Sequence, residues 1–316
     1  MEPETDAETA TAVFTEHHEL LFGIVYSMLG TVADTEDVLQ ETWLAWEARS
    51  HGAPIEHPRA YLVRVAINAA IARQGAIRRR RETYIGPWLP EPLATGSAPD
   101  RASYERATYD RAVHGASADD GADQALRVES VSLALMVVLE SLTPTERAVF
   151  VLADVFGYGH HEIAEMLDRT PASVRQTAHR ARAHVQARRP KYRVDPALHR
   201  RVTERFMAAV SGGDLAALIG LMAPDVELTC DGGGLAPAAG PRPMHGAERI
   251  AAFLVGRTFR RSEGLEIGFR PVNGSPSALM EREGRVVGVL MLDVRDDGAV
   301  TGVYAVTNPE KLTQLR

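Results

Sequence analysis

Cysteine is nearly absent from this chain of 316 residues, in which Cys230 is the only one. A single thiol excludes an internal disulfide and a zinc site built on cysteines. No spacing of His, Asp and Glu residues replaces such a site, so we expect no bound metal and no cofactor. The thiol itself is expected to pack as a small buried apolar group rather than to react.

Long apolar runs are also missing, because no stretch approaches the roughly 18 residues that a helix needs to cross a bilayer. The first residues, MEPETDAETATAV, are acidic and lack the basic and apolar parts of a secretory signal. The length and an ordinary hydrophobic fraction of 45% fit about two or three folded domains. These features exclude a membrane protein and predict a cytoplasmic location.

Basic residues are outnumbered by acidic ones, 35 to 42, so the formal net charge is −7. The distribution of positive charge is uneven. Eight basic residues and no acidic ones lie from Arg169 to Arg193, and a second cluster comprises Arg73 and Arg78 to Arg81. Phosphates are neutralised locally, so positive charge is needed only where a polyanion is contacted. The two patches therefore predict two contacts with one nucleic acid.

The segment from Ile163 to Val185 has the pattern of a helix-turn-helix. Thr170 is a candidate cap for the second helix, and Pro171 suits its first position. Four small apolar residues recur at helical spacing and are expected to face the first helix: Val174, Ala178, Ala181 and Val185. Gln176, His179 and Arg180 then point outward, as side chains that read a major groove must. The alternative is a basic, solvated helix in an ordinary helical hairpin.

Residues 10–84 are predicted to form a helical domain of three helices. The first is amphipathic from Val13 and Phe14 to Leu29 and ends at Gly30, the second has Asp34 as its expected cap, and the third begins at Pro58. Residues 85–128 lose the apolar periodicity and are interpreted as a linker. Trp88 and its neighbouring prolines are expected to dock on another surface, although a chance aromatic in a loop is the alternative.

Residues 129–193 form a second predicted helical domain, in which Thr143, Pro144 and Glu146 have the pattern of a capping box. Residues 196–316 change character. Two helices precede the strand VELTCD, and a helix near residues 247–255 leads into strands separated by Asn273-Gly274, Glu283-Gly284 and Asp297-Gly298. Helices followed by an antiparallel meander predict an α+β domain.

These segments resemble a known family. The sequences DTEDVLQETWLAW, PRAYLVRVAIN and residues 143–185 are similar to regions 2 and 4 of extracytoplasmic-function (ECF) sigma factors, the promoter-recognition subunits of bacterial RNA polymerase. WLPEP, DGGG and NPEKL resemble motifs of the subgroup called ECF41 or SigJ-like. That subgroup carries a fused C-terminal domain of the SnoaL-like, nuclear-transport-factor-2-like (NTF2-like) fold. The implied fold is multidomain: two all-α sigma domains and an α+β cone.

The resemblance also implies site residues. Those expected to bind core polymerase are Asp37, Gln40, Glu41 and Trp43. Those expected to bind the minus-10 element are Asn68, Arg73, Arg78, Arg79, Arg80 and Arg81, and those for the minus-35 element are Ser173, Arg175, Gln176, His179 and Arg180. Ala72 stands where many relatives carry an acidic residue, and Leu235 where a lysine is common, so neither contact is carried over.

The three subgroup motifs are expected to regulate the sigma domains in cis. Their residues are Trp88, Leu89, Pro90, Glu91 and Pro92; Asp231, Gly232, Gly233 and Gly234; and Asn308, Pro309, Glu310, Lys311 and Leu312. We expect no separate anti-sigma factor, and a small ligand of the C-terminal domain is possible.

Two other functions stay open at this stage. One is a ligand-responsive helix-turn-helix regulator. The other is a SnoaL-like isomerase or cyclase, for which Asp231, His245, Asp293 and Tyr304 are the candidate acids and bases. A shared fold does not establish catalysis, and the expected function is a sigma factor and not an enzyme.

Overall fold

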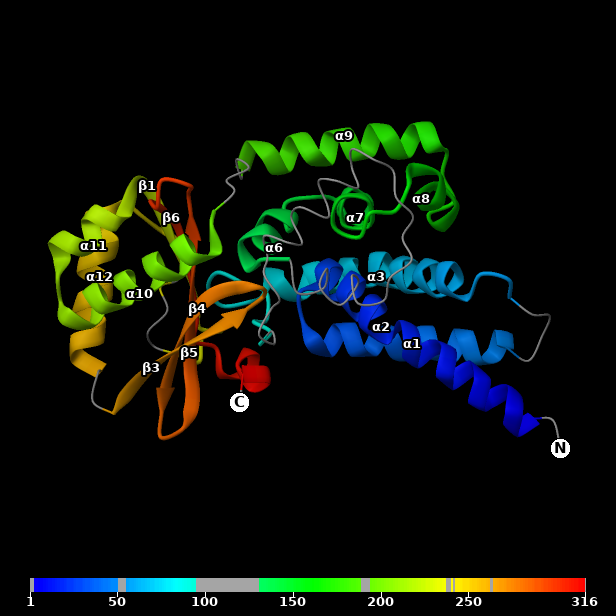
Figure 1. The fold of residues 1–316 in the computed structure, drawn as a ribbon, viewed down its shortest axis with the longest axis horizontal. Helices are drawn as coiled ribbons and strands as arrows, with labels where there is room; N and C mark the ends of the chain where they lie inside the picture. The colour runs from blue at the N-terminus through cyan, green and yellow to red at the C-terminus, as the bar shows by residue number, and fades with distance from the viewer. Residues whose placement is uncertain are drawn as a thin grey trace. The chain divides into compact units, whose positions relative to one another are not determined.

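The computed structural model describes residues 3–50, 55–94, 131–188, 194–236, 240, 242–261 and 264–315 (Figure 1). These residues divide into two compact units. The first, the helical unit, contains helices α1 to α3 and α7 to α9. The second, the sheet unit, contains residues 83–94, the start of α6 and all described residues from 194 onward.

Three long helices begin the helical unit: α1 (Pro3–Leu29), α2 (Val32–Ser50) and α3 (Pro58–Glu82). The predicted apolar face of α1 is buried, with Leu21, Ile24 and Met28 fully covered. Gly30 ends α1 with a φ of 77°, a backbone conformation that glycine adopts without strain. The three predicted helices of residues 10–84 are thus present.

Asp34 does not cap α2, contrary to the sequence prediction. The helix begins two residues earlier, at Val32, and Thr31 takes the capping role. The Thr31 hydroxyl accepts from the Asp34 backbone N–H at 3.4 Å and donates to the Asp34 carboxylate at 2.7 Å. The prediction was wrong because both residues are good caps, and the side chain of Asp34 is used elsewhere.

Four further helical elements complete this unit: α7 (Pro144–Phe150), the π-helical turn η1 (Val151–Val155), α8 (His160–Met166) and α9 (Pro171–Arg188). The predicted capping box at the start of α7 is present, with both Thr143 and Glu146 bonded to the backbone of the other. The buried apolar residues of α9 are the four predicted at helical spacing, and Thr177 is buried beside them. The π-helical turn had no sequence signal.

A partly buried charge cluster joins α1, α3 and α7 within the helical unit. Glu140 pairs with Arg81 and, at 2.6 Å, with Arg147. Arg147 donates to the Ser27 carbonyl at 2.9 Å, and Arg81 donates to the Leu29 carbonyl at 2.9 Å. The last turn of a helix leaves carbonyls without helical partners, and these two arginines satisfy two of them.

The sheet unit contains α6 (Leu133–Leu139) up to Val137, α10 (Pro196–Gly212), α11 (Leu215–Leu221) and α12 (Ala247–Arg261). Its strands are β1 (Met222–Asp231), β2 (Met244–His245), β3 (Leu265–Val272), β4 (Ser275–Arg282), β5 (Arg285–Val294) and β6 (Val300–Val306). Two short 3-10 turns, η2 (Pro309–Lys311) and η3 (Thr313–Leu315), follow β6.

The six strands form one mixed sheet in the order β2-β1-β6-β5-β4-β3. Strands β3 to β6 are the predicted antiparallel meander, and positive φ at Asn273-Gly274 and Glu283-Gly284 makes the tight turns between strands possible. Strand β1, however, pairs with β6 in parallel, which the sequence pattern did not predict. The α+β class is confirmed.

The two faces of this sheet are covered differently, because side chains alternate along each strand. Leu290 and Leu292 pack with Phe206 of α10 and Ile250 of α12 on the helical face. Val289 and Met291 belong to a separate cluster on the other face. That cluster contains the linker residue Leu89, Leu133 of α6, and Leu312 and Leu315 of the C-terminal turns. Figure 1 shows α10 to α12 beside the sheet.

Candidate functional site

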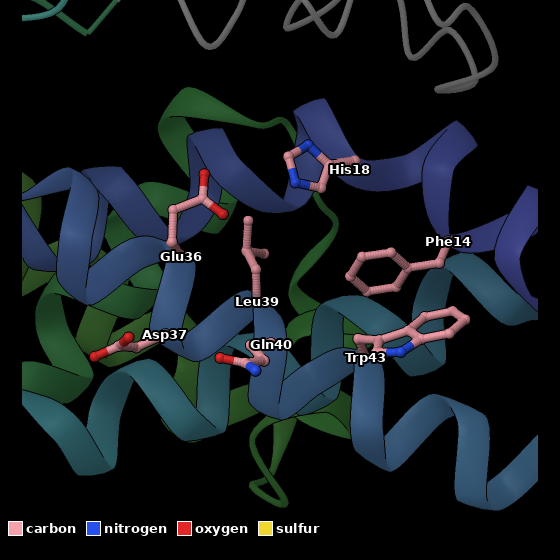
Figure 2. A pocket seen from close by; sticks show the side chains of 7 residues that line it. All are labelled: Phe14, His18, Glu36, Asp37, Leu39, Gln40 and Trp43. Atoms are coloured by element: carbon pink, nitrogen blue, oxygen red, sulfur yellow. The ribbon is translucent and has the colours of Figure 1, made fainter. Parts of the chain in front are cut away.

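An acidic and aromatic surface lies on α2. Asp37, Gln40 and Glu41 are exposed, whereas Trp43 is half-buried against Phe14 with ring centroids 5.2 Å apart. Three of these predicted residues, Asp37, Gln40 and Trp43, line a groove of 330 Å³ (Figure 2). Glu36 and Leu39 of α2 and His18 of α1 line it as well. The surface therefore combines carboxylates with an apolar floor.

Sequence reasoning missed the contribution of α1 to this groove. Phe14 had been assigned to the buried face of α1, but it is half-buried and lines the groove together with His18. The two residues are one helical turn apart, and this i, i+4 pair of rings is the signal that could have indicated a shared surface.

The arginines at the end of α3 differ in their exposure and in the carboxylates with which they pair. Arg78, Arg79 and Arg80 are exposed, although Arg80 also pairs with Asp34 at 2.6 Å. Arg81 belongs to the partly buried cluster with Glu140 described above, where burial and the nearby Arg147 lower the pKa of Arg81 to about 9.

Arg73 is engaged too, by three carboxylates of α2: Asp34, Asp37 and Glu41. Burial alone would raise the pKa of Asp34, but hydrogen bonds from Thr31, Arg80 and Arg73 lower it below its ordinary value. Predicted DNA-binding and predicted polymerase-binding residues are therefore bonded to each other.

Asn68 lies on the exposed side of α3. Its amide donates to the carbonyls of Arg64 at 2.7 Å and of Met166 at 2.9 Å. Met166 is the last residue of α8. The hydrogen bond from Asn68, a predicted minus-10 residue, therefore links α3 to α8 within the helical unit.

The outward face of α9 presents Arg175, Gln176, His179 and Arg180, all exposed. Thr170 caps this helix as predicted, accepting from the Ser173 backbone N–H at 3.2 Å. Ser173 is half-buried. Arg180 approaches Glu146 at 3.6 Å, and hydrogen bonds from Thr143 together with this arginine lower the pKa of Glu146. The face offers guanidinium, amide and imidazole groups side by side on one helix.

The three subgroup motifs meet in the sheet unit at a buried ion pair. Asp231, fully buried at the end of β1, lies 2.7 Å from Nζ of Lys311, whose side chain is 9% exposed. The same carboxylate accepts from the Leu89 backbone N–H at 2.8 Å, and Lys311 donates to the Leu89 carbonyl at 2.6 Å. We call Asp231, Lys311 and their partners from residues 84–89 the clamp.

Two aromatic rings complete the clamp. Nζ of Lys311 lies 4.2 Å from the Trp88 ring centroid and 4.9 Å from that of Tyr84, both at cation–π distance. Tyr84 donates to Asp231 at 2.6 Å. Burial and this hydrogen bond raise the pKa of the Tyr84 phenol. Sequence reasoning missed Tyr84, and its only signal was an aromatic residue between the basic helix and WLPEP.

The other motif residues surround the clamp or flank it. Gly233 has a φ of 60° and lies against the Asn308 side chain, so no side chain fits at position 233. Asn308 donates to the Tyr84 hydroxyl at 2.9 Å. Of the remaining residues, those buried are Pro90, Glu91, Pro92, Leu312 and Gly232, and those exposed are Pro309 and Glu310, while Gly234 packs beside Ile85.

The candidate acids and bases for catalysis are not assembled into one site. Asp231 is held in its ion pair, and His245 is exposed on β2 near Glu227. Asp293 and Tyr304 both flank Gly302. Among the described residues, no group of three His, Cys, Asp or Glu side chains is arranged to hold a metal. No described helix is long and apolar enough to cross a membrane.

Known proteins resemble this chain over nearly its whole length. Residues 13–83 match the Sigma-70 region 2 family, and residues 132–185 match Sigma-70, region 4. The chain is 36% identical to the ECF RNA polymerase sigma factor SigJ of Mycobacterium tuberculosis over 93% of its own length and 90% of that protein. This chain belongs to the ECF RNA polymerase sigma factors.

Two further comparisons extend over the C-terminal part of this ECF sigma factor. It is 28% identical to the probable ECF RNA polymerase sigma factor SigI of the same species, with 98% and 97% of the two chains covered. The crystal structure of M. tuberculosis SigJ matches with a TM-score of 0.69 at 32% identity, and 98% of each chain is covered.

The comparisons confirm the expected class of function. As a sigma factor, the protein binds core RNA polymerase and promoter DNA and directs the polymerase to promoters. Sigma factors initiate transcription and catalyse no reaction of their own, so this ECF sigma factor is not an enzyme.

Proposed function

We propose that the C-terminal domain, residues 196–316, regulates this sigma factor in cis by holding the linker between its two sigma regions. The observation that carries the proposal is the clamp, in which Asp231 and Lys311 bind the backbone of Leu89 and the ring of Tyr84. A buried ion pair is costly to break on one side, because the remaining charge is left without compensation.

The start of the linker and the start of the second sigma region contact the same sheet face. The region 2 match ends at residue 83, directly before Tyr84, and the region 4 match begins at residue 132, directly before Leu133. Leu89 and Leu133 belong to one apolar cluster with Val272. Ala94 also pairs with Val272 as an isolated bridge. A domain that binds the chain at both points controls how far the joined regions separate.

The residue assignments of the sigma regions are part of the same proposal. Residues 10–84 and 129–193 act as regions 2 and 4, and residues 85–128 link them. The exposed face of α2 docks on a basic surface of the polymerase, for which its carboxylates are suited. The end of α3 binds the minus-10 element, and the outward face of α9 reads the minus-35 element.

The regulation is proposed to need no separate anti-sigma factor, because the regulatory domain is part of the chain. A small ligand of the C-terminal domain would shift the balance only by binding one arrangement of the linker better than the other. We further propose a cytoplasmic location, because core polymerase acts there.

Point variants of the full chain test the clamp. We expect K311Q and D231N to change run-off transcription by about threefold or more, both in the same direction, because each breaks the same ion pair. E266Q, at an exposed position on β3 of the same domain, is the matched control and should leave output unchanged. Output equal to wild type in both clamp variants, with core polymerase still bound, would remove regulation through the clamp.

A further inference from the structure

The side chain of Arg73 extends from α3 across an acidic stripe on α2. Asp34, Asp37 and Glu41 are three and four residues apart and therefore lie along one face of the helix. Nε of Arg73 lies 3.2 Å from Oδ1 of Asp34, Nη1 lies 3.2 Å from Oε1 of Glu41, and Nη2 contacts Oδ2 of Asp37. One guanidinium thus bonds to three carboxylates.

The exposures show which groups in this network face solvent. The side chain of Arg73 is 25% exposed and that of Asp34 8%, whereas those of Asp37 and Glu41 are 56% and 59% exposed. Burial alone would lower the pKa of Arg73, but its bond to Asp34 and the charges of Asp37 and Glu41 raise it. Arg73 therefore keeps its positive charge and lies less exposed than the carboxylates of Asp37 and Glu41 that it contacts.

This arrangement is unfavourable for DNA binding by Arg73. A phosphate would have to replace three carboxylates that already surround the guanidinium. Arg78, on the same helix, is exposed and needs no such exchange. The rigid fork of an arginine instead suits the task of fixing several carboxylates at once.

We propose that Arg73 is a positioning residue for polymerase docking, and not a DNA contact: it holds the carboxylates of Asp37 and Glu41 in the orientation that the polymerase binds. The inference rests on the proposed docking face of α2. Each carboxylate bonds to Arg73 through one oxygen, Oδ2 of Asp37 and Oε1 of Glu41, which leaves its other oxygen for a basic partner. Ordering both side chains in advance reduces the entropy lost on binding.

Arg73 also has an electrostatic effect on polymerase binding that opposes the effect of positioning. The guanidinium neutralises part of the acidic face, so its removal would strengthen long-range attraction to a basic partner. Such attraction between exposed charges is screened beyond about 8 Å at physiological salt. Pre-organisation acts at contact and is not screened in this way. The two effects therefore predict opposite changes in polymerase affinity when Arg73 is replaced.

The test uses full-length R73Q and, as matched control, R78Q, which removes the same charge from the same helix. Two quantities are measured: affinity for core polymerase by competition with labelled wild type, and promoter DNA affinity of the polymerase-free chain at several salt concentrations. We expect R73Q to weaken core binding about tenfold and to leave the salt slope of DNA binding unchanged. R78Q should leave core binding unchanged and reduce that slope by about one.

A double-mutant cycle separates positioning from damage to the fold. In a D37N/E41Q background, R73Q should cause no further loss of core affinity, because the carboxylates that it positions are gone. R73K should recover only part of the affinity, since an ammonium keeps the charge but lacks the fork. Additive losses, full recovery by lysine, tighter core binding of R73Q, or a DNA defect alone would each overturn the role of Arg73. Unchanged core binding of D37N/E41Q would instead overturn the docking face itself.

Discussion

Single charged residues in this protein have their surroundings set by partners from other segments. Asp34 is the clearest case in the helical unit, since Thr31, Arg73 and Arg80 all donate to its carboxylate, which is 8% exposed. A carboxylate in this position stabilises the fold only while it is ionised, and its contribution must therefore depend on pH.

The stability contributed by Asp34 should be lost in acid. Its pKa is lowered in the folded protein, so the unfolded chain binds more protons as the pH falls, and stability decreases with it. We expect D34N to reduce the free energy of unfolding by about 2 kcal/mol at pH 7. The difference from wild type should shrink once the pH is below about 4.

Urea unfolding of wild type and D34N at a series of pH values measures this difference. E36Q, at an exposed position of the same helix, provides the control and should show no such dependence. A D34N deficit that is the same at pH 3 and pH 7 would contradict an ionised role for Asp34.

At the scale of helices and strands, local sequence patterns predicted some features and missed others. Local signals predicted the long helices, the capping box at Thr143 and the turns at Asn273 and Glu283, because each depends on residues close in sequence. The parallel pairing of β1 with β6 and the role of Tyr84 depend on residues far apart in sequence. No periodicity encodes such contacts.

The candidate sites divide in the same way. The motif at Asp231 could be recognised from the sequence, but its partner Lys311 is 80 residues away. Arg73 was grouped with the other arginines of α3 because a sequence shows charge but not which carboxylates lie opposite. The sequence therefore predicted which residues belong to the candidate sites, but not which of them pair with each other.

The contact between the loop after β1 and the C-terminal turns predicts a difference between two glycines. Both Gly233 and Gly284 have positive φ, at 60° and 71°. Only Gly233 lies against another side chain, that of Asn308, while the space around Gly284 is open. We expect G284A to cost about 1 kcal/mol of unfolding free energy, from backbone strain alone. G233A should cost at least about 2 kcal/mol, because it also displaces the C-terminal turns.

Denaturant unfolding of both variants, monitored by circular dichroism, compares the two costs. Equal losses for G233A and G284A would mean that the close approach of Asn308 contributes nothing to docking of the C-terminal turns.

At the scale of the whole molecule, the segment between Ala94 and Leu133 has both of its ends on one sheet. Leu89 and Ala94 contact the sheet at one end of the segment, and Leu133 does so at the other. Lengthening such a segment costs little, since ten added residues change its closure free energy by only about 0.2 kcal/mol. The distance between its anchored ends does not change.

We therefore expect insertion of ten Gly and Ser residues within residues 95–130 to leave promoter output of the full chain nearly unchanged. In the K311Q background the same insertion should reduce output severalfold, because the separation of regions 2 and 4 then depends on linker length. Run-off transcription with the four chains measures both effects. Equal sensitivity to the insertion with and without K311Q would show that the anchors do not set the separation.

The position of the single cysteine in the fold has a practical consequence. Cys230 is half-buried on β1, packs against the helical face of the sheet, and directly precedes Asp231. A thiol in such a place reacts with alkylating reagents mainly when the surrounding structure opens. The rate at which Cys230 is alkylated therefore reports how often the C-terminal domain opens, and no second thiol contributes to the signal.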